Sequence, residues 1–524
     1  GPSIDLVRHS PAVPAAGQPV VVTARVSDPD GLSSVSLRFR TVETAAFSSV
    51  AMRDDGAGGD ALAGDGIWSG ILNGRGSGEL VQFIVEAFDN ATSTASSIFP
   101  SGTVYAGLPA VSGANIRWGD PVPTGTFNHV HAWLTTSQNT WLSNGQDSSL
   151  VGGLDNTFRD CTLVHGNLRV IYNAGIRRKG SPFTGQADYA LTVSGDDLLL
   201  GTRDRVYGLT GNGGEEATRM RNQIVNWIAR KMGVPYLNTA YMRFYRNGSP
   251  FGSVSEDLEQ PSNEYAESWY PDGGSGDLRK VAFAFEFDDS GGFAPTGADL
   301  GIYRNPNGQY NLSRYRFNWQ GRPTGTTAND FTNFFAMVTA ANDRSANFVP
   351  NLLNIADINQ WMRSFALDGC LGNWDTWGTG NSQNKYIYFQ PGGRWRILPW
   401  DMDWVLGVGD PTNRRLFGGN DGAVNVMFDT PIFQRMAWRA YQEAVSGPLT
   451  AAQYQPQFTA RSAALSFNGV TGISSPALIG SYLNGRRTYL NTQITASDAK
   501  AFAITTSGGN NFISTTPVAI IDGT

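Results

Sequence analysis

Hydrophobic and polar residues alternate along several short segments in the N-terminal part of the chain. Three of these segments are rich in β-branched residues: 20–26, 35–39 and 80–87. A period of two residues is typical of strands that bury one face. Residues 27–31 predict a short loop, and the acidic, glycine-rich segment 54–66 predicts a long one. This pattern predicts an all-β sandwich over residues 1–107.

After a predicted linker at residues 104–112, the hydrophobic period changes. Apolar residues recur every three or four positions in 217–232 and 354–367, which predicts two helices. Strands are predicted around them at 189–193, 240–245, 281–287 and 386–389. The mixture predicts a large α+β domain over residues 113–498. Residues 499–524 return to a β-like composition, and we expect them to begin a truncated C-terminal β-module.

The composition narrows the classes of function. The chain has a formal net charge of −6 and its basic residues form no run, so we exclude nucleic-acid binding. Charged residues are 16% of the chain, against about 25% in an average soluble protein. This low charge and the 62 glycines favour a secreted or cell-surface protein. No apolar stretch approaches the roughly 20 residues that span a bilayer.

The N-terminus and the cysteines add two expectations. The chain begins with Gly1-Pro2, the pair that remains after a protease removes a tag, so we expect the natural chain to be longer at this end. Cys161 and Cys370 are too few for a disulfide framework or a cysteine-rich zinc site. One bridge between them and two buried free thiols both remain open.

Carboxylates and amides concentrate in residues 369–404. Asp375 follows a predicted helix and a glycine-rich turn, and Asn384 precedes a predicted strand. Asp401 and Asp403 are predicted on the next strand, where a period of two places both side chains on one face. A hairpin between the two strands would bring Asn384 beside Asp401. Such oxygen donors are the ligands that Mg²⁺ or Mn²⁺ prefers.

Turn formation is the alternative for part of this cluster. Asp beside Gly often caps a turn, which would explain Asp375 without any chemistry. Asp401 and Asp403 lie among Trp, Leu and Met residues, where a carboxylate is costly unless it is paired or bound to a metal. A metal site is therefore favoured for these two residues.

Several motifs in this region resemble the CotH family, which is named after a spore-coat protein and is similar to atypical secretory-pathway kinases. The most specific are Gly-Asn-Trp-Asp at 372–375, Asn-Lys-Tyr-Ile-Tyr at 384–388 and Leu-Pro-Trp-Asp-Met-Asp at 398–403. Two earlier segments also occur in the order typical of the family: the basic turn at 175–181 and the Gly-Asp-Leu-Arg-Lys segment at 276–280. The N-terminal sandwich is similar to the immunoglobulin-like modules of bacterial surface proteins.

The resemblance implies a role for each candidate residue. Asp375 would orient or deprotonate the acceptor hydroxyl, and Asp401 would bind the metal. Asn384 and Asp403 would complete the metal shell. The residues expected to hold the phosphates of ATP are Arg177, Lys179 and Lys280, with Glu259 orienting one of them. This set is sufficient for phosphoryl transfer.

The implied activity is that of an extracytoplasmic protein kinase that requires ATP and Mg²⁺ or Mn²⁺ and modifies Ser or Thr of a secreted or surface protein. Two departures from the family's pattern keep other functions open. The segment 185–190 lacks a lysine pair that many members carry, and Asn384 lies nine positions after Asp375, where a typical kinase has five. The alternatives are an inactive scaffold for surface adhesion and a module of a polysaccharide-degrading system.

The long acidic loop of the N-terminal sandwich is a second candidate site. Asp54, Asp55, Asp60 and Asp65 are spaced so that a folded loop could offer several oxygens to Ca²⁺. Ordinary Asp-Gly turns are the alternative.

Overall fold

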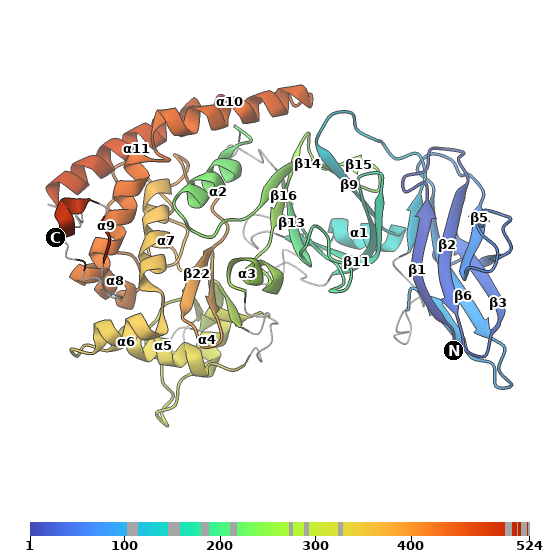
Figure 1. The fold of residues 1–524 in the computed structure, drawn as a ribbon, viewed down its shortest axis with the longest axis horizontal. Helices are drawn as coiled ribbons and strands as arrows, with labels where there is room; N and C mark the ends of the chain where they lie inside the picture. The colour runs from blue at the N-terminus through green and yellow to red at the C-terminus, as the bar shows by residue number, and fades with distance from the viewer. Residues whose placement is uncertain are drawn as a thin grey trace. The chain divides into compact units, whose positions relative to one another are not determined.

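The computed structural model describes most of the chain. The described residues are 1–101, 114–144, 158–179, 188–209, 217–271, 276–287, 293–322, 329–497, 506–510, 512–514 and 521. They form two compact units, the first built mainly from the N-terminal half and the second mainly from the C-terminal half (Figure 1). The predicted linker at 104–112 and most of the predicted C-terminal module at 499–524 lie outside the described residues.

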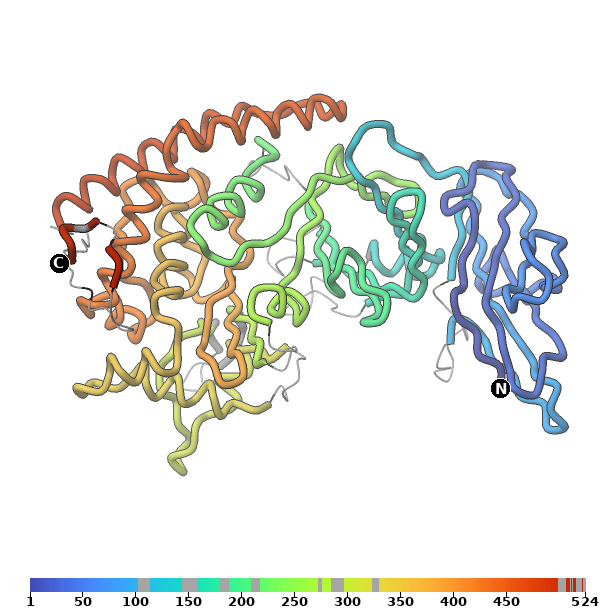
Figure 2. The backbone as a smooth tube through the Cα atoms, in the orientation of Figure 1, coloured from blue at the N-terminus to red at the C-terminus, as the bar shows by residue number. Residues whose placement is uncertain are grey.

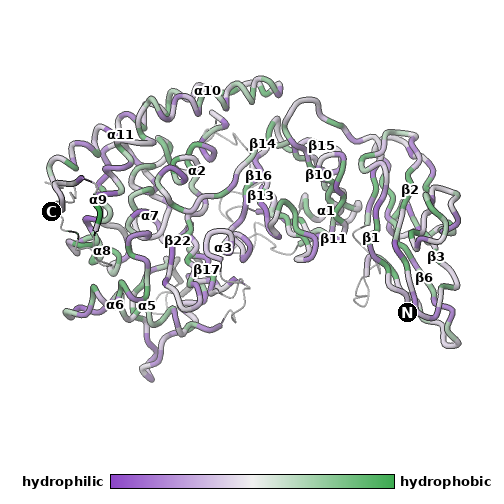
Figure 3. The backbone as a smooth tube through the Cα atoms, in the orientation of Figure 1, coloured by the Kyte–Doolittle hydropathy of each residue, from purple (hydrophilic) through white to green (hydrophobic). Residues whose placement is uncertain are grey.

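The first unit begins with a β-sandwich. One sheet contains β1 (Ser3–Ser10), β2 (Val20–Ser27) and β5 (Ile67–Leu72). The other contains β3 (Leu32–Arg40), β4 (Ser48–Ala51), β6 (Leu80–Asp89), β7 (Ser96–Phe99) and β8 (Asn115–Arg117). The three predicted strands and both predicted loops are confirmed. Figure 3 shows hydrophobic and hydrophilic positions interspersed along the strands of the sandwich, and the side chains of Val20, Val22, Ala24 and Val26 on β2 are buried between the sheets.

The all-β architecture of this region is therefore confirmed, while its immunoglobulin-like topology stays a prediction. Strand β8 pairs with β6, and Ile116 and Trp118 lie in the sandwich core. The sandwich thus includes residues beyond the predicted boundary at 107.

The rest of the first unit is a sheet that closes on itself. Its strands are β9 (Asn128–Trp133), β10 (Arg159–His165), β11 (Arg169–Lys179), β12 (Asp188–Thr192), β13 (Asp204–Leu209), β14 (Thr239–Arg246), β15 (Ser249–Pro250) and β16 (Ser255–Glu259). The parallel pairing of β14 with β9 closes the ring. Helix α1 (Thr136–Asn144) follows β9. Cys161 is a buried free thiol in the core of this sheet.

The second unit combines a small sheet with helices. The sheet order is β20 (Trp319–Gly321), β17 (Asp277–Val281), β21 (Lys385–Phe389) and β22 (Trp395–Pro399), and β18 (Ala284–Phe287) pairs separately with β19 (Phe293–Thr296). The helices wholly within it are α2 (Arg221–Lys231), α4 (Leu312–Asn318), α5 (Thr332–Asn342), α6 (Phe348–Ile355), α7 (Ile358–Leu371), α8 (Gly422–Asp429), α9 (Pro431–Ser446) and α11 (Ala477–Ala496). The division between the units falls within α3 (Asn263–Trp269) and α10 (Ala451–Phe467). Helix α7 lies against β22 (Figure 1), where Gln360 bonds both backbone groups of Ile397.

Three predicted elements begin late or are broken in the structure. The helix predicted at 217–232 begins only at Arg221, because Arg219 has a left-handed backbone. The helix predicted at 354–367 is broken at Ala356, whose extended backbone pairs with Trp395 before Asp357 caps α7. The strand predicted at 281–287 is likewise interrupted between β17 and β18.

Two further observations concern the cysteines and the hydrophobicity of the helices. Cys370 is, like Cys161, a buried free thiol, so the structure contains no bridge between them. Of the helices that the structure describes, none has both the length and the hydrophobicity needed to cross a membrane.

Candidate active site

Asp375 lies in the loop between α7 and β21. The helix ends at Leu371 and is capped by Gly372, whose left-handed backbone (φ 69°) suits a glycine. The carboxylate oxygen Oδ1 accepts hydrogen bonds from Asn381 Nδ2 and Gln383 Nε2, both at 2.7 Å. The other oxygen, Oδ2, accepts one from Asn384 Nδ2 at 3.0 Å. These three partners are neutral amides, which orient the carboxylate without cancelling its charge.

Asn384 and Asp401 flank the same end of the β21–β22 hairpin. The register pairs Lys385 with Pro399, so Asn384 directly precedes the paired strands and Asp401 follows them by two residues. Both residues have left-handed backbones, with φ of 58° and 53°. A residue other than glycine rarely adopts this conformation, and such residues cluster at functional sites. The predicted hairpin is confirmed.

The predicted placement of Asp401 and Asp403 on one face of a strand is wrong. Strand β22 ends at Pro399, and the left-handed turn at Asp401 breaks the period of two. Asp403 is exposed, and its Oδ1 accepts a hydrogen bond from the backbone N–H of Trp404 at 2.9 Å. Asp375, Asp401 and Asp403 also form no cluster of three close carboxylates among the described residues.

The donor set that remains for a cation is smaller than the sequence suggested. The amide nitrogen of Asn384 donates to both the carboxylate and the backbone carbonyl of Asp375, each at 3.0 Å. This orientation leaves the Oδ1 atom of Asn384 as its donor for a metal ion. Amide and carboxylate oxygens are the ligand types that a hard cation prefers, so Asn384 and Asp401 are the residues that would hold one.

The segment after Asp401 packs against the loop that carries Asp375. The backbone N–H of Leu406 donates to the carbonyl of Leu371 at 2.8 Å. The rings of Trp374 and Trp404 meet edge to face, 6.0 Å apart. The two acidic segments, which are separated in sequence by the hairpin, therefore lie side by side (Figure 2).

A buried ion pair supports this loop. Lys385 Nζ donates to Asp368 Oδ2 in the last turn of α7 and to Thr376 Oγ1, the latter at 2.7 Å. Asp368 Oδ1 also accepts from Asn373 Nδ2 at 3.1 Å. Burial raises the pKa of the Asp368 carboxyl and lowers the pKa of the Lys385 ammonium, while the charge of each partner offsets part of that shift.

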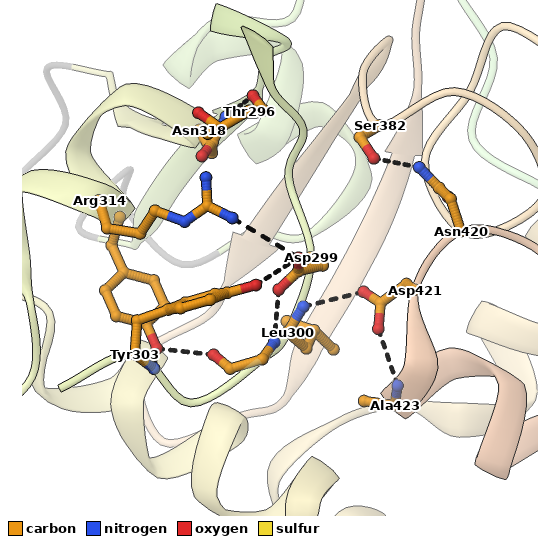
Figure 4. A network of polar contacts seen from close by, with 12 residues as sticks. Thr296, Asp299, Leu300, Tyr303, Arg314, Asn318, Ser382, Asn420, Asp421 and Ala423 are labelled. Atoms are coloured by element: carbon orange, nitrogen blue, oxygen red, sulfur yellow. Dashed lines mark hydrogen bonds and ion pairs between the residues drawn. The ribbon is translucent and has the colours of Figure 1, made fainter. Parts of the chain in front are cut away.

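A second buried carboxylate contacts the loop at Trp377. Asp421 caps α8, where its Oδ1 accepts from the backbone N–H of Ala423 at 2.9 Å. Its Oδ2 accepts from Leu300 N at 2.9 Å and from Trp377 Nε1 at 2.8 Å. Figure 4 shows Asp421 beside the segment of Asp299, and burial raises the pKa of Asp421 to about 6.

The other candidate phosphate ligands are divided between the units. Arg177 and Lys179 lie half-buried on β11 of the first unit, where the Arg177 guanidinium lies over the ring of Phe158. Glu259, on β16 of the same unit, is buried and accepts two hydrogen bonds from Asn238. Lys280 belongs to the second unit.

Lys280 lies within β17 rather than at the start of a strand. Its neighbours in the sheet are Gln320 on β20 and Tyr386 on β21, and its side chain is half-buried. It therefore belongs to the same sheet as the hairpin between Asn384 and Asp401.

Three of the four predicted calcium ligands come together in the N-terminal loop. The carboxylates of Asp54, Asp60 and Asp65 offer oxygens within 4.8 Å of one another. Asp55 instead forms an ion pair with Arg53 at 3.6 Å. Backbone N–H groups already bond all three carboxylates: Gly64, Asp65 and Gly66 donate to Asp54, Gly56 donates to Asp60, and Ile67 donates to Asp65. Calcium binding stays a prediction, because an ordinary closed loop without a metal ion would form the same hydrogen bonds.

Titration of the full chain with Ca²⁺ tests this prediction. We expect calorimetry to detect binding that Asp60→Asn weakens by about tenfold or more, because the substitution removes one charged oxygen ligand. Asp28→Asn, in the neighbouring loop, is the matched control and should leave binding unchanged. Absence of heat at millimolar Ca²⁺ would leave the acidic loop as a structural turn.

Sequence reasoning missed Asp368, Lys385 and Asp421. Lys385 carried a readable signal, because a charged residue inside an apolar strand needs a buried partner. Asp421 precedes an apolar helix, which is typical of an N-cap. The sequence around Asp368 does not predict its pairing with Lys385, because the two residues are 17 positions apart.

The order of these features along the chain is similar to that of a protein kinase site. Helix α7 is followed by a loop with Asp375 and Asn384, then by the β21–β22 hairpin and Asp401. Protein kinases use the same order for the catalytic loop and the metal-binding Asp. The family model described as CotH kinase protein matches residues 193–466, more than half of the chain. The chain therefore belongs to the CotH family. No curated protein matches the sequence.

Proposed function

We propose that this protein is an atypical kinase that transfers the γ-phosphate of ATP to Ser or Thr of a secreted or cell-surface protein. The observation that carries the proposal is the carboxylate of Asp375, held by three amides in a loop that packs against the segment of Asp401. Phosphoryl transfer needs little more from a protein than positioning and charge neutralisation.

In the proposed reaction Asp375 accepts the proton of the acceptor hydroxyl. The hydroxyl oxygen forms a bond to the γ-phosphorus, the bond from that phosphorus to the β–γ bridging oxygen breaks, and ADP leaves. Asn384 and Asp401 would hold Mg²⁺ or Mn²⁺, with Asp403 as a further candidate ligand. The ion, when bound, neutralises charge on the phosphates.

Basic residues are proposed to hold the phosphates. Lys280 is the first candidate, because its strand pairs with the strand that follows Asn384. Arg177 and Lys179 are candidates in the first unit, and Glu259 would orient one of the basic residues. The glycine-rich, weakly charged composition supports an extracytoplasmic location, with the N-terminal sandwich as a spacer.

An inactive scaffold is the second candidate function, favoured by the long spacing between Asp375 and Asn384. A module of a polysaccharide-degrading system is the third candidate: Trp361, Trp377 and Trp400 are buried and offer no stacking platform for a sugar, whereas Trp374 and Trp404 are half-buried.

The deciding experiment measures nucleotide binding and phosphate incorporation on the full chain. With ATP and Mn²⁺ at a hundred times the Kd, binding to the folded state should stabilise it by about 2.7 kcal/mol, seen as a higher melting temperature. Radiolabelled phosphate should enter a Ser- and Thr-rich acceptor protein. A melting curve unchanged by Mg²⁺ or Mn²⁺ nucleotides, with no incorporation, would support the scaffold instead.

A further inference from the structure

The buried ion pair between Lys385 and Asp368 contacts the loop that carries Asp375. The side chains of Lys385 and Asp368 are each only 1% exposed. Lys385 directly follows Asn384, and its Nζ donates to the hydroxyl of Thr376, which directly follows Asp375. One ammonium group therefore connects the residues next to the proposed base and the proposed metal ligand.

Asp368 extends these contacts to both ends of the loop. It lies in the last turn of α7, before the loop begins, and its Oδ1 accepts a hydrogen bond from Asn373 at the start of the loop. Its Oδ2 accepts from Lys385 at the first position of β21. The loop that carries Asp375 is thus fastened where it leaves the helix, beside Asp375, and where it enters the sheet.

This arrangement does more than fill space. Two buried charges lose their hydration, and packed apolar side chains of similar size often stabilise a fold equally well. Apolar side chains in place of Lys385 and Asp368 could not bond Thr376 or Asn373. The directional bonds are therefore what the ion pair adds at this position.

A separate anchor holds the next residue. Trp377 donates to Asp421, the buried cap of α8 that Figure 4 shows bonded to Leu300 and Ala423. Because Trp377 stays anchored when the Thr376 bond is lost, a change at Thr376 alone should displace the neighbourhood of Asp375 without unfolding the loop.

We propose that Lys385 and Asp368 are positioning residues, which fix Asp375 for the transfer step through the hydroxyl of Thr376. The inference rests on the proposed kinase activity. Displacement of a reacting group by about 1 Å can cost on the order of 10²-fold in rate. The proposal therefore predicts a loss in kcat with little change in nucleotide affinity.

Thr376→Val tests the proposal, because valine keeps the shape of threonine and removes only the oxygen that Lys385 bonds. We expect kcat for phosphate transfer to fall roughly 10- to 100-fold, with the Kd for ATP and Mn²⁺ within about twofold. Thr376→Ser, which restores the oxygen, should recover most of kcat. Thr379→Val, in the same loop but without a bond to Lys385, is the matched control.

Hydrogen exchange provides a readout that does not depend on activity. In Thr376→Val the amide of Asn381, which closes the loop by bonding the carbonyl of Trp374, should exchange faster, while those of α7 should not. Faster exchange in a chain whose parent transfers no phosphate would support the anchoring and count against the kinase function. Unchanged exchange, or an unchanged kcat in an active chain, would overturn the proposal.

Discussion

Asp375→Ala is expected to abolish most phosphate transfer while leaving nucleotide binding intact. The substitution removes the proposed proton acceptor, and loss of a single acid–base or electrostatic group commonly costs on the order of 10²–10³ in rate. It leaves Asn384 free of its bond to the carboxylate, although the second bond, to the backbone carbonyl of residue 375, remains available. The measurements are kcat with labelled ATP and the Kd for ATP in the presence of Mn²⁺.

Asp401→Ala should behave differently. This carboxylate is the proposed metal ligand, so its removal should weaken metal-dependent nucleotide binding as well as transfer. The variant should lose the thermal stabilisation that ATP and Mn²⁺ give the parent chain, whereas Asp375→Ala should retain it.

A surface carboxylate provides the control for both variants. Asp429 is exposed at the end of α8, and Asp429→Ala should match the parent in binding, transfer and melting temperature. If Asp375→Ala and Asp401→Ala both retain full incorporation, or both melt far below the parent without ligand, the assignment of this site is wrong.

The strands and the hairpin could be predicted because their signal is local. Alternation of apolar residues in 20–26 gives the buried face of β2 directly, and the Pro-Gly-Gly turn at 391–393 separates two apolar runs that pair as β21 and β22. The order of acid, amide and acid around that hairpin could be read for the same reason.

The local backbone at the site could not be predicted. The apolar residues around Asp401 continue the pattern of a strand, and only the fold imposes the left-handed turn that ends it. The break between α6 and α7 has a similar cause. Ala356 favours a helix by itself, but its pairing with Trp395 of β22, far along the chain, requires an extended backbone.

Lys385→Met is expected to destabilise the second unit strongly, by about 3–5 kcal/mol, because it leaves Asp368 buried without its counter-charge. Urea and thermal unfolding of the full chain measure this loss. Lys231→Met is the matched control, since it makes the same change at an exposed position in the last turn of α2. Its unfolding free energy should stay within about 0.5 kcal/mol of the parent.

The stability that Lys385→Met loses should increase as the pH rises. Burial raises the pKa of Asp368, and the ammonium of Lys385 opposes this shift, so removing Lys385 should raise the pKa further in the folded state. A carboxyl whose folded pKa exceeds its unfolded pKa binds its proton more tightly when folded, so its contribution to stability falls as pH rises through the folded value. The stability that Lys385→Met loses relative to the parent should therefore be smaller at pH 5 than at pH 8.

A double variant provides the control. Asp368→Asn added to Lys385→Met removes the unpaired charge, so the double variant should be more stable at pH 8 than Lys385→Met and should lose the pH dependence. A deficit independent of pH, or a double variant no more stable than the single one, would show that packing rather than charge accounts for the loss.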